Sequence, residues 1–151
     1  MDHERVIAEN RKARHDFFIL SSLEAGLALV GTEVKSLRAG KASLADSYAA
    51  IEGGEAFLHH MHISPYDPAS RFNHDPLRKR KLLLHRSEIR RLRRETDEKG
   101  CTLVPLRLYF NAEGRVKVIL AVAKGRRAHD RRDAIAERDA QREIARAVKE
   151  R

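Results

Sequence analysis

The residues of this chain most able to do chemistry are arginines and lysines that gather in long runs. Residues 124–151 hold ten Lys/Arg and six Asp/Glu, with Ile135, Ile144 and Val148 as their only large apolar residues. At about 100° per residue, a helix would carry five of these cations on one face: Arg131, Arg138, Arg142, Arg146 and Lys149. Such a stripe can neutralise the phosphates of a polyanion. We expect this tail to be disordered when free, because its arginines repel at i,i+4 spacing and no apolar seam compensates. A solvated helix on the protein's own surface is the alternative.

A second basic tract lies between Pro76 and Arg94, where nine cations face one acidic residue, Glu88. The nine are Arg78, Lys79, Arg80, Lys81, Arg86, Arg90, Arg91, Arg93 and Arg94. Cations at this density release counterions from nucleic-acid phosphates, which is the term that dominates affinity. With no Trp, three Tyr and five Phe, stacking platforms for single-stranded bases are scarce. The expected target is therefore a folded RNA, recognised by its shape, phosphates and 2′-hydroxyls. A solubilising face is the alternative.

Metal and catalytic sites find little support in the sequence. Four histidines could be zinc ligands: His59, His60, His62 and His74. Neither a Cys pair nor an H-E-x-x-H motif accompanies them, so a zinc site has little support. No phosphate-loop, dinucleotide-binding or hydrolase-elbow motif occurs. We therefore predict no metal and no cofactor.

An RNA-processing enzyme remains as a competing class, with His74-Asp75 or His129-Asp130 as its acid/base pair. Adjacent residues of an extended chain point to opposite sides, which is poor geometry for a shared substrate atom. Cys101 has no recognisable base beside it and is a weak candidate nucleophile. We predict no catalytic residue and a protein that is not an enzyme.

Composition limits the class of protein. A net charge of +9 with 35% charged residues favours nucleic acid or an anionic membrane surface as partner. No run approaches 18 apolar residues, so we expect no membrane crossing, and residues 1–12 lack the apolar region of a secretory signal. The single cysteine fits a reducing compartment. These features predict a cytoplasmic protein.

The elements that must position these residues are mostly short strands. Alternation of apolar residues between turn signals predicts strands over 17–31 (as one strand or a bent pair), 48–51, 56–63, 81–85, 103–110 and 116–122. Gly53-Gly54 marks a hairpin between the strands predicted over 48–51 and 56–63. The stretch from Asn111 to Gly114 marks another between the strands predicted over 103–110 and 116–122. Residues 64–77 hold three of the four prolines and are expected to be a loop. Residues 1–16 are polar and expected to be mobile at their start.

Two helices are predicted from capping signals. Thr32 is the expected N-cap of a helix over 33–39 that ends before Gly40. Ser87 is the expected N-cap of a helix over 88–99 that stops at Gly100. Five or six short antiparallel strands with two or three small helices predict a mainly β fold, an OB-like barrel, since closure removes exposed strand edges. A split sheet packed on helices is the alternative. The expected domains are a barrel over 1–123 and a basic tail over 124–151.

Several blocks of the sequence, in order from about residue 10 to 149, resemble the small protein B family, the SsrA-binding proteins of bacteria. The blocks are 10–15, 31–38, 46–48, 73–76, 81–85, 124–127 and 129–132, with Arg78 and Arg80. Two departures are Ala69-Ser70, where many members have Gly-Asn, and Arg126-Arg127, where Lys-Lys is common. Several long blocks in one order are highly specific, unlike any single block.

The resemblance implies an OB-like adaptor, not a catalyst. Such an adaptor binds the tRNA-like domain of transfer-messenger RNA and delivers it to the vacant A site of a stalled ribosome. Its partners would be that RNA, small-subunit ribosomal RNA and, through the aminoacylated RNA complex, elongation factor Tu. It would act as a monomer. A constitutive ribosomal protein is the alternative that composition leaves open.

The resemblance also implies two sets of site residues. Those for transfer-messenger RNA are Asn10, Arg11, Lys12, Arg14, His15, Glu24, Arg78, Arg80, Lys81, Leu83 and His85. Those for the ribosomal decoding centre and empty messenger channel, where the tail is expected to be helical, are Lys124, Gly125, Arg126, Arg127, His129, Asp130, Arg131, Arg132, Arg138, Arg142 and Arg146. Glu24 is unusual on an RNA surface; it can accept from base amino groups or 2′-hydroxyls, so its expected role is specificity.

Overall fold

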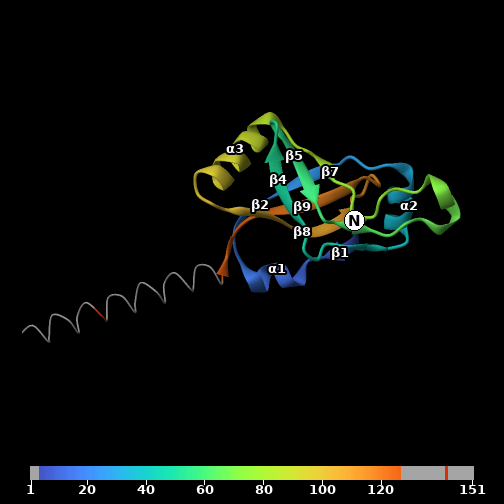
Figure 1. Cartoon of the computed structure of the whole chain (residues 1–151), viewed down its shortest axis with the longest axis horizontal. Coiled ribbons are helices and arrows are strands. Elements are labelled where there is room, and N and C mark those ends of the chain that lie inside the picture. The colour runs from blue at the N-terminus through green and yellow to red at the C-terminus, as the bar shows by residue number, and fades with distance from the viewer. Residues whose placement is uncertain (1–3, 127–141, 143–151) are drawn as a thin grey trace, which may run out of the picture.

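A closed ring of antiparallel strands forms the centre of the computed structural model, which describes residues 4–126 and residue 142 (Figure 1). In spatial order the ring contains β4 (Tyr48–Glu52), β5 (Glu55–His59), β7 (Arg80–Leu83), β2 (Phe17–Leu27), β9 (Val116–Gly125) and β8 (Thr102–Phe110). It closes because β8 pairs with both β9 and β4. The predicted mainly β, OB-like barrel is confirmed.

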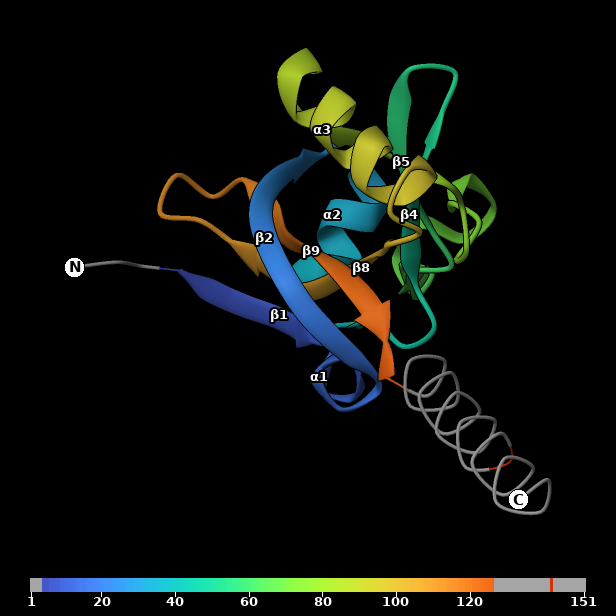
Figure 2. The ribbon, with the colours of Figure 1, turned by 90° about the vertical axis from the view of Figure 1, so that its left-hand side faces the viewer.

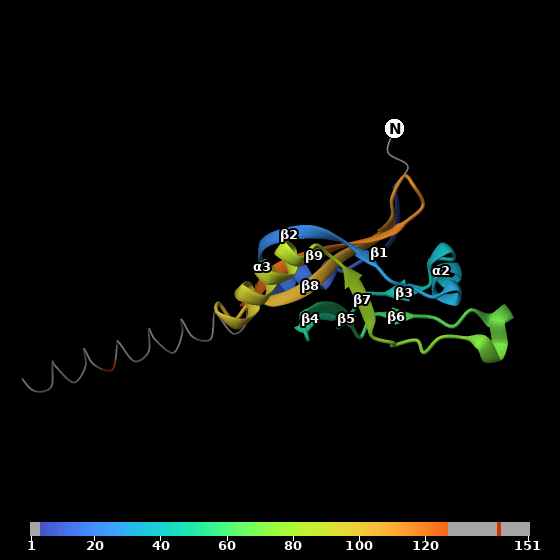
Figure 3. The same ribbon diagram turned by 90° about the horizontal axis from the view of Figure 1, so that it is seen from above.

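Of the strands in the described residues, three lie outside the ring. β1 (Arg5–Glu9) pairs with β8, and β3 (Ala42–Ser43) pairs with β6 (His62–Ile63) in a small separate sheet (Figure 3). A 3-10 helix, η1 (Asp67–Phe72), lies in the segment expected to be a loop.

In residues 4–126 the structure has three α-helices, which pack around the strands. They are α1 (Arg11–Asp16), α2 (Gly31–Arg38) and α3 (Arg86–Asp97). Figure 2 shows α1 and α3 at opposite ends of β2. Among the described helices, none is long and apolar enough to span a membrane.

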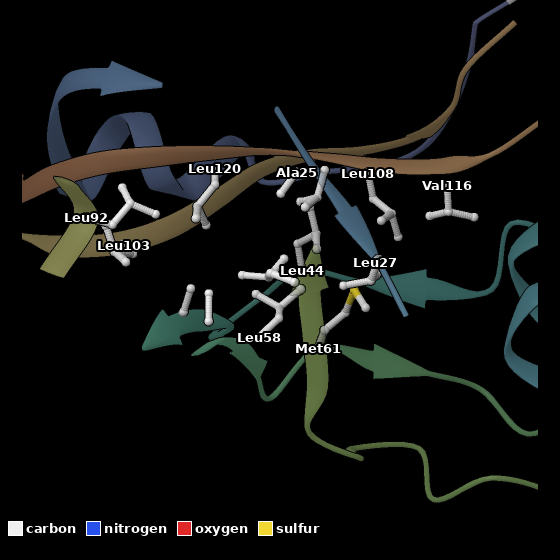
Figure 4. Packing of buried hydrophobic residues seen from close by; sticks show 14 of the residues in the cluster. Ala25, Leu27, Leu44, Leu58, Met61, Leu92, Leu103, Leu108, Val116 and Leu120 are labelled. Atoms are coloured by element: carbon white, nitrogen blue, oxygen red, sulfur yellow. The ribbon is translucent and has the colours of Figure 1, made fainter. Parts of the chain in front are cut away.

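The interior of the ring is filled by aliphatic side chains (Figure 4). Four of these side chains have no exposed surface: Leu58, Leu103, Leu108 and Leu120. Leu92 of α3 packs in the same cluster. Burying each such side chain contributes roughly 1.5–3 kcal/mol, so this cluster holds the strands that carry the candidate sites.

The sequence analysis predicted no helix or strand in residues 5–16, but these residues form β1 and α1. Asn10 connects the two. Its backbone N–H donates to the Leu106 carbonyl (2.8 Å), its side-chain amide donates to the Pro105 carbonyl (3.0 Å), and its Oδ1 accepts from the N–H of Ala13 (3.2 Å). The Pro105 and Leu106 carbonyls lie about 95 residues along the chain from Asn10, so local sequence gave no signal for these two bonds.

Both predicted helix caps are also wrong. α2 begins at Gly31 with Val30 as its N-cap residue, because the Glu33 carboxylate accepts from the Val30 N–H (2.9 Å). α3 begins at Arg86 because the Glu88 carboxylate accepts a hydrogen bond from the N–H of His85 (2.9 Å). In each case a glutamate at the third helical position determines where the helix starts.

The two predicted hairpins are confirmed. Gly53 and Gly54 have φ angles of 57° and 77°, the left-handed values that a two-residue turn between β4 and β5 needs. β5 is shorter than predicted, since His60 adopts a φ of 60° and turns the chain into β6.

Candidate RNA-binding surfaces

Four of the predicted transfer-messenger RNA positions line one hollow of about 610 Å³ on the outside of the barrel. Glu24 comes from β2, Lys81 and Leu83 from β7, and His85 from the connection to α3, with Lys117 of β9 beside them. We name this the β2–β7 hollow. Nothing in the sequence places Glu24 near residues almost sixty positions later, and the strand pairing brings them together.

Close approach of the two strands builds the floor of the hollow. Gly26 pairs with Leu83 across the β2–β7 ladder. A Cβ atom on Gly26 would lie 3.2 Å from the Leu83 Cβ, so only glycine lets the strands approach without displacing that side chain. Leu83 keeps 52% of its surface exposed, which leaves an apolar contact surface between the charged groups.

Glu24 is held by a buried tyrosine of β8. The Tyr109 hydroxyl donates a hydrogen bond to its Oε2 atom, and Tyr109 is 1% exposed. Burial and the neighbouring Glu24 carboxylate raise the pKa of Tyr109 to about 12, so the phenol remains a donor at neutral pH. Glu24 itself is exposed. Its carboxylate is therefore oriented by one oxygen and available to an outside donor through the other.

Lys81 and His85 add polar groups to the hollow. The Lys81 ammonium lies 3.0 Å from a Glu55 carboxylate oxygen in a half-exposed ion pair. Such pairs are weak, so a phosphate can compete for the lysine. His85 is exposed, and the bond from its N–H to Glu88 fixes its backbone at the start of α3.

Arg80, which the sequence analysis also expected to contact the RNA, does not line this hollow. The side chain is fully buried. Its Nε donates to Glu33 Oε2 (2.5 Å), and its terminal nitrogens donate to the Met61 and Pro76 carbonyls. Each of the three guanidinium nitrogens thus has a protein acceptor, and the side chain has no exposed surface through which a phosphate could reach it.

Glu33 is the centre of this buried network, and it also receives Arg78, whose Nη2 lies 2.5 Å from Oε1. Burial alone would raise the pKa of Glu33. Hydrogen bonds from Arg78, the Val30 N–H and Arg80 outweigh that cost and hold the pKa below its ordinary value of 4.5. The network joins α2 to β7. Arg78 is 37% exposed, so it combines this pairing with a partly accessible surface.

The cations of the second basic tract that lack a salt bridge in the described residues lie on α3. Lys79 pairs with Glu52 (3.1 Å), Arg93 with Asp97 (3.5 Å), and Arg91 donates to the Ser21 hydroxyl (3.2 Å). In the part of the chain that the structure describes, no salt bridge occupies three exposed arginines at i, i+4 and i+8: Arg86, Arg90 and Arg94. Part of the tract thus serves folding, and the rest forms an exposed basic face.

The predicted N-terminal cluster lies at the other end of β2. Arg11, Lys12, Arg14 and His15 are exposed on α1, whereas the Asn10 side chain is engaged by the bonds described above. Seven residues of β2, about 23 Å of strand, separate Phe17 at the end of α1 from Glu24. The structure therefore does not bring this cluster to the β2–β7 hollow.

The start of the tail lies beside that cluster. Arg14 shares a hollow of about 600 Å³ with Lys124 and Arg126. The Arg126 Nε donates to the Phe17 carbonyl (3.3 Å), and its guanidinium carbon lies 4.1 Å from the centroid of the Phe18 ring. This cation–π contact and hydrogen bond fix the first residue after β9 against β2.

Most predicted ribosome contacts lie outside the described residues: Arg127, His129, Asp130, Arg131, Arg132, Arg138 and Arg146. Lys124 and Gly125 belong to the end of β9, and Lys124 and Arg142 are exposed.

The candidate zinc histidines and the His74-Asp75 pair are separated or engaged, and His129-Asp130 lies outside the described residues. Within residues 4–126 and 142, no three metal-binding side chains come together. The two ring nitrogens of His74 lie 2.8 Å from the Thr32 hydroxyl and 2.9 Å from the Ile63 carbonyl oxygen, which leaves none for acid/base work with Asp75. Cys101 is buried.

Comparison with known proteins agrees with this geometry. Residues 7–150 match the family described as SmpB protein. The chain belongs to this family. The SsrA-binding protein of Symbiobacterium thermophilum is 63% identical over 95% of this chain and 90% of its own length. The SsrA-binding protein of Moorella thermoacetica is 60% identical over 97% of this chain and 95% of its own length.

A solved structure in the family shares the fold. The structure described as "tmRNA-SmpB: a journey to the center of the bacterial ribosome" contains a chain that is 56% identical to this one. The match has a TM-score of 0.66 and covers 78% of this chain and 82% of that chain. The β2–β7 hollow therefore lies on a scaffold that this chain shares with a chain of that solved structure.

Proposed function

We propose that this protein is an RNA-binding adaptor of ribosome rescue. It binds transfer-messenger RNA and accompanies it to stalled ribosomes. The main support for this proposal is the 56% identity to a chain of the solved tmRNA-SmpB structure. The arrangement of Glu24, Lys81, Leu83 and His85 around one hollow agrees with it. The hollow contains no arrangement suited to catalysis, and its chemistry is recognition.

Each residue of the hollow has a separate part in that recognition. Lys81 and Lys117 attract phosphates, while Leu83 offers apolar contact to a sugar or base. Glu24, oriented by Tyr109, accepts from a base amino group or a 2′-hydroxyl and so selects which RNA fits. His85 contacts the same RNA through its exposed ring, and the half-exposed Arg78 adds to the basic surroundings. Affinity comes from the cations and specificity from the carboxylate.

The tail supplies the second half of the function. We propose that residues 124–151 enter the decoding centre and the empty messenger channel as a helix, while the barrel holds the tRNA-like domain in the vacant A site. The nascent chain is then tagged for proteolysis. Elongation factor Tu joins through the aminoacylated RNA, and the protein acts as a monomer in the bacterial cytoplasm. The basic stripe of the tail matches a surface lined by ribosomal RNA phosphates.

A direct test is to sequence the RNA that co-purifies with the full chain. Transfer-messenger RNA should dominate, and its absence would contradict the proposal. The variant Glu24→Ala should lose about tenfold in affinity for the tRNA-like domain with an unchanged melting temperature, whereas loss of folding would indicate a structural role. Glu113→Ala, in the exposed β8–β9 turn, serves as the matched control.

The division between barrel and tail has its own test. We propose that the barrel binds transfer-messenger RNA without the tail. The fragment should end at residue 126 rather than 123, because β9 runs to Gly125 and Arg126 contacts β2. Gel shifts at several salt concentrations should show binding by both forms, falling steeply with salt. A fragment without measurable binding would overturn this division.

A further inference from the structure

A second, smaller hollow of about 330 Å³ lies between α1 and the start of β4. Lys12 and Asp16 line it from α1, and Asp46 and Tyr48 line it from the turn that leads into β4. Its volume is at the lower end of the range for small-ligand sites. It is separate from the β2–β7 hollow, with which it shares no residue.

Tyr48 offers this hollow an aromatic ring that is already held in place. The ring stacks on His59 with centroids 5.1 Å apart and planes 13° from parallel, and it remains 38% exposed. His59 in turn lies 2.7 Å from Glu52, which pairs with Lys79. A ring fixed before its partner arrives loses little side-chain entropy on binding.

Asp46 has an uncommon backbone conformation. Its φ angle is 61°, in the left-handed region that few residues other than glycine adopt. The next residue keeps the turn closed, since the Ser47 hydroxyl and N–H both donate to the Leu44 carbonyl (2.5 and 3.1 Å). In the described part of the chain, no hydrogen bond or ion pair occupies the exposed Asp46 carboxylate. Strain that presents an unengaged group at a hollow is typical of a binding site.

We propose that this hollow binds one unpaired nucleobase that carries an amino group, stacked on Tyr48 with its phosphate at Lys12. This rests on the proposed RNA-binding function and adds a contact to it. Carboxylates accept from the amino groups of adenine, cytosine and guanine, whereas uracil has none. Asp46 supplies the acceptor. Asp16 is 3.1 Å from the His15 ring and is less available.

The inference differs from what composition suggests, since the sequence has few aromatic residues for stacking. A single platform is enough for one base, and stacking a base on an aromatic side chain commonly contributes about tenfold or more in affinity. The structure assigns that platform to Tyr48 because His59 supports the ring and the hollow lies beside it.

The test uses three variants of the full chain: Tyr48→Phe, Tyr48→Leu and Asp46→Gly. Affinities are measured for the tRNA-like domain of transfer-messenger RNA, for purified ribosomes and for the hexanucleotides r(A)6 and r(U)6. Tyr48→Leu should weaken one of the two large RNA partners about tenfold, and that partner is the source of the base. Tyr48→Phe should stay within about twofold of wild type. The wild-type protein should prefer r(A)6 to r(U)6. Phe72→Leu, at an exposed aromatic residue of η1, is the matched control.

Asp46→Gly separates binding from stability. Glycine adopts a positive φ without strain, so its melting temperature should equal or exceed that of the wild type, while its preference for r(A)6 should disappear. Unchanged binding to both large RNAs by Tyr48→Leu, or an unchanged hexanucleotide preference in Asp46→Gly, would overturn the inference. Failure of the wild type to bind the tRNA-like domain would instead contradict the proposed function, and the hexanucleotide comparison would still test the hollow.

Discussion

Glu24 and Glu33 are both carboxylates next to strand β7, yet their surroundings give them opposite roles. Glu33 is fully buried and accepts from Arg78, Arg80 and the Val30 N–H. Glu24 is exposed and held by one buried phenol. A carboxylate saturated by protein donors serves the fold, whereas one with a free oxygen can still recognise a ligand.

The same contrast divides the second basic tract. Arg80 and Lys81 are neighbours in sequence, but successive side chains of a strand point to opposite faces. Arg80 points inward to Glu33, and Lys81 points outward to the β2–β7 hollow. A run of cations is therefore not one surface. The burial of each member decides whether it contributes to stability or to RNA binding.

The largest effect should follow Glu33→Gln. Removing this charge leaves two arginines without their partner, one of them fully buried, and breaking a buried ion pair costs about 3–5 kcal/mol of unfolding free energy. Urea denaturation measures it, with Glu52→Gln as a control at a half-exposed, solvent-screened carboxylate that should change little. RNA affinity per folded molecule should be unchanged. A loss no larger than that of Glu52→Gln would remove the distinction between the two carboxylates.

Acid should reproduce that loss in the wild-type protein. Because the folded-state pKa of Glu33 is lowered, its contribution to stability is complete above its ordinary value of 4.5 and disappears as pH falls through the lowered pKa. The difference in unfolding free energy between wild type and Glu33→Gln should be constant near neutral pH and shrink below about pH 4. A difference that stays constant down to pH 2 would contradict the assignment.

Gly26→Ala should have the next largest effect, on the hollow. The added Cβ would lie 3.2 Å from the Leu83 Cβ, and such overpacking costs about 1–3 kcal/mol. Affinity for the tRNA-like domain should also fall, since Leu83 must move. Gly31→Ala is the matched control, because a Cβ there meets no atom within 4 Å. Equal behaviour of the two variants would show that the close approach is unimportant.

Tyr109→Phe should produce a smaller change. It removes the hydrogen bond that orients Glu24, which contributes about 1 kcal/mol of stability. Affinity should fall by only a few fold, less than in Glu24→Ala, because the carboxylate remains but samples more rotamers. The phenolate signal of Tyr109 is the difference between the titrations of the wild type and Tyr109→Phe, and it should appear only near its pKa of about 12. A larger loss of affinity than in Glu24→Ala would reverse the roles assigned here.

The smallest effect on stability should come from Phe18→Leu at the start of the tail. The cation–π contact with Arg126 contributes about 0.5–1 kcal/mol. Transfer-messenger RNA binding should be unchanged, while tagging on stalled ribosomes should fall a few fold because the tail is no longer fixed against β2. Phe18→Trp should retain tagging. If Phe18→Leu tags as well as the wild type, the contact does not position the tail.

Local patterns in the sequence determined much of the fold. Alternating apolar residues and the Gly53-Gly54 pair predicted the hairpins, because side-chain period and turn geometry are properties of neighbouring residues. The runs of Lys and Arg indicated an RNA partner, because charge density is also visible among neighbouring residues. Several motif blocks in one order indicated the family. β1 and α1 were missed, since Asn10 is held by carbonyls of Pro105 and Leu106 that no local pattern reveals.

The division of labour among the charged residues was decided only by the tertiary structure. Sequence treated Arg80 and Lys81 alike, and it gave Asp46 and Tyr48 no role beyond a family motif. Strand pairing buries Arg80 on Glu33, brings Glu24 beside Leu83, and places Tyr48 over His59. Burial and hydrogen-bond partners depend on contacts between distant segments, and these contacts exist only once the ring of strands has closed.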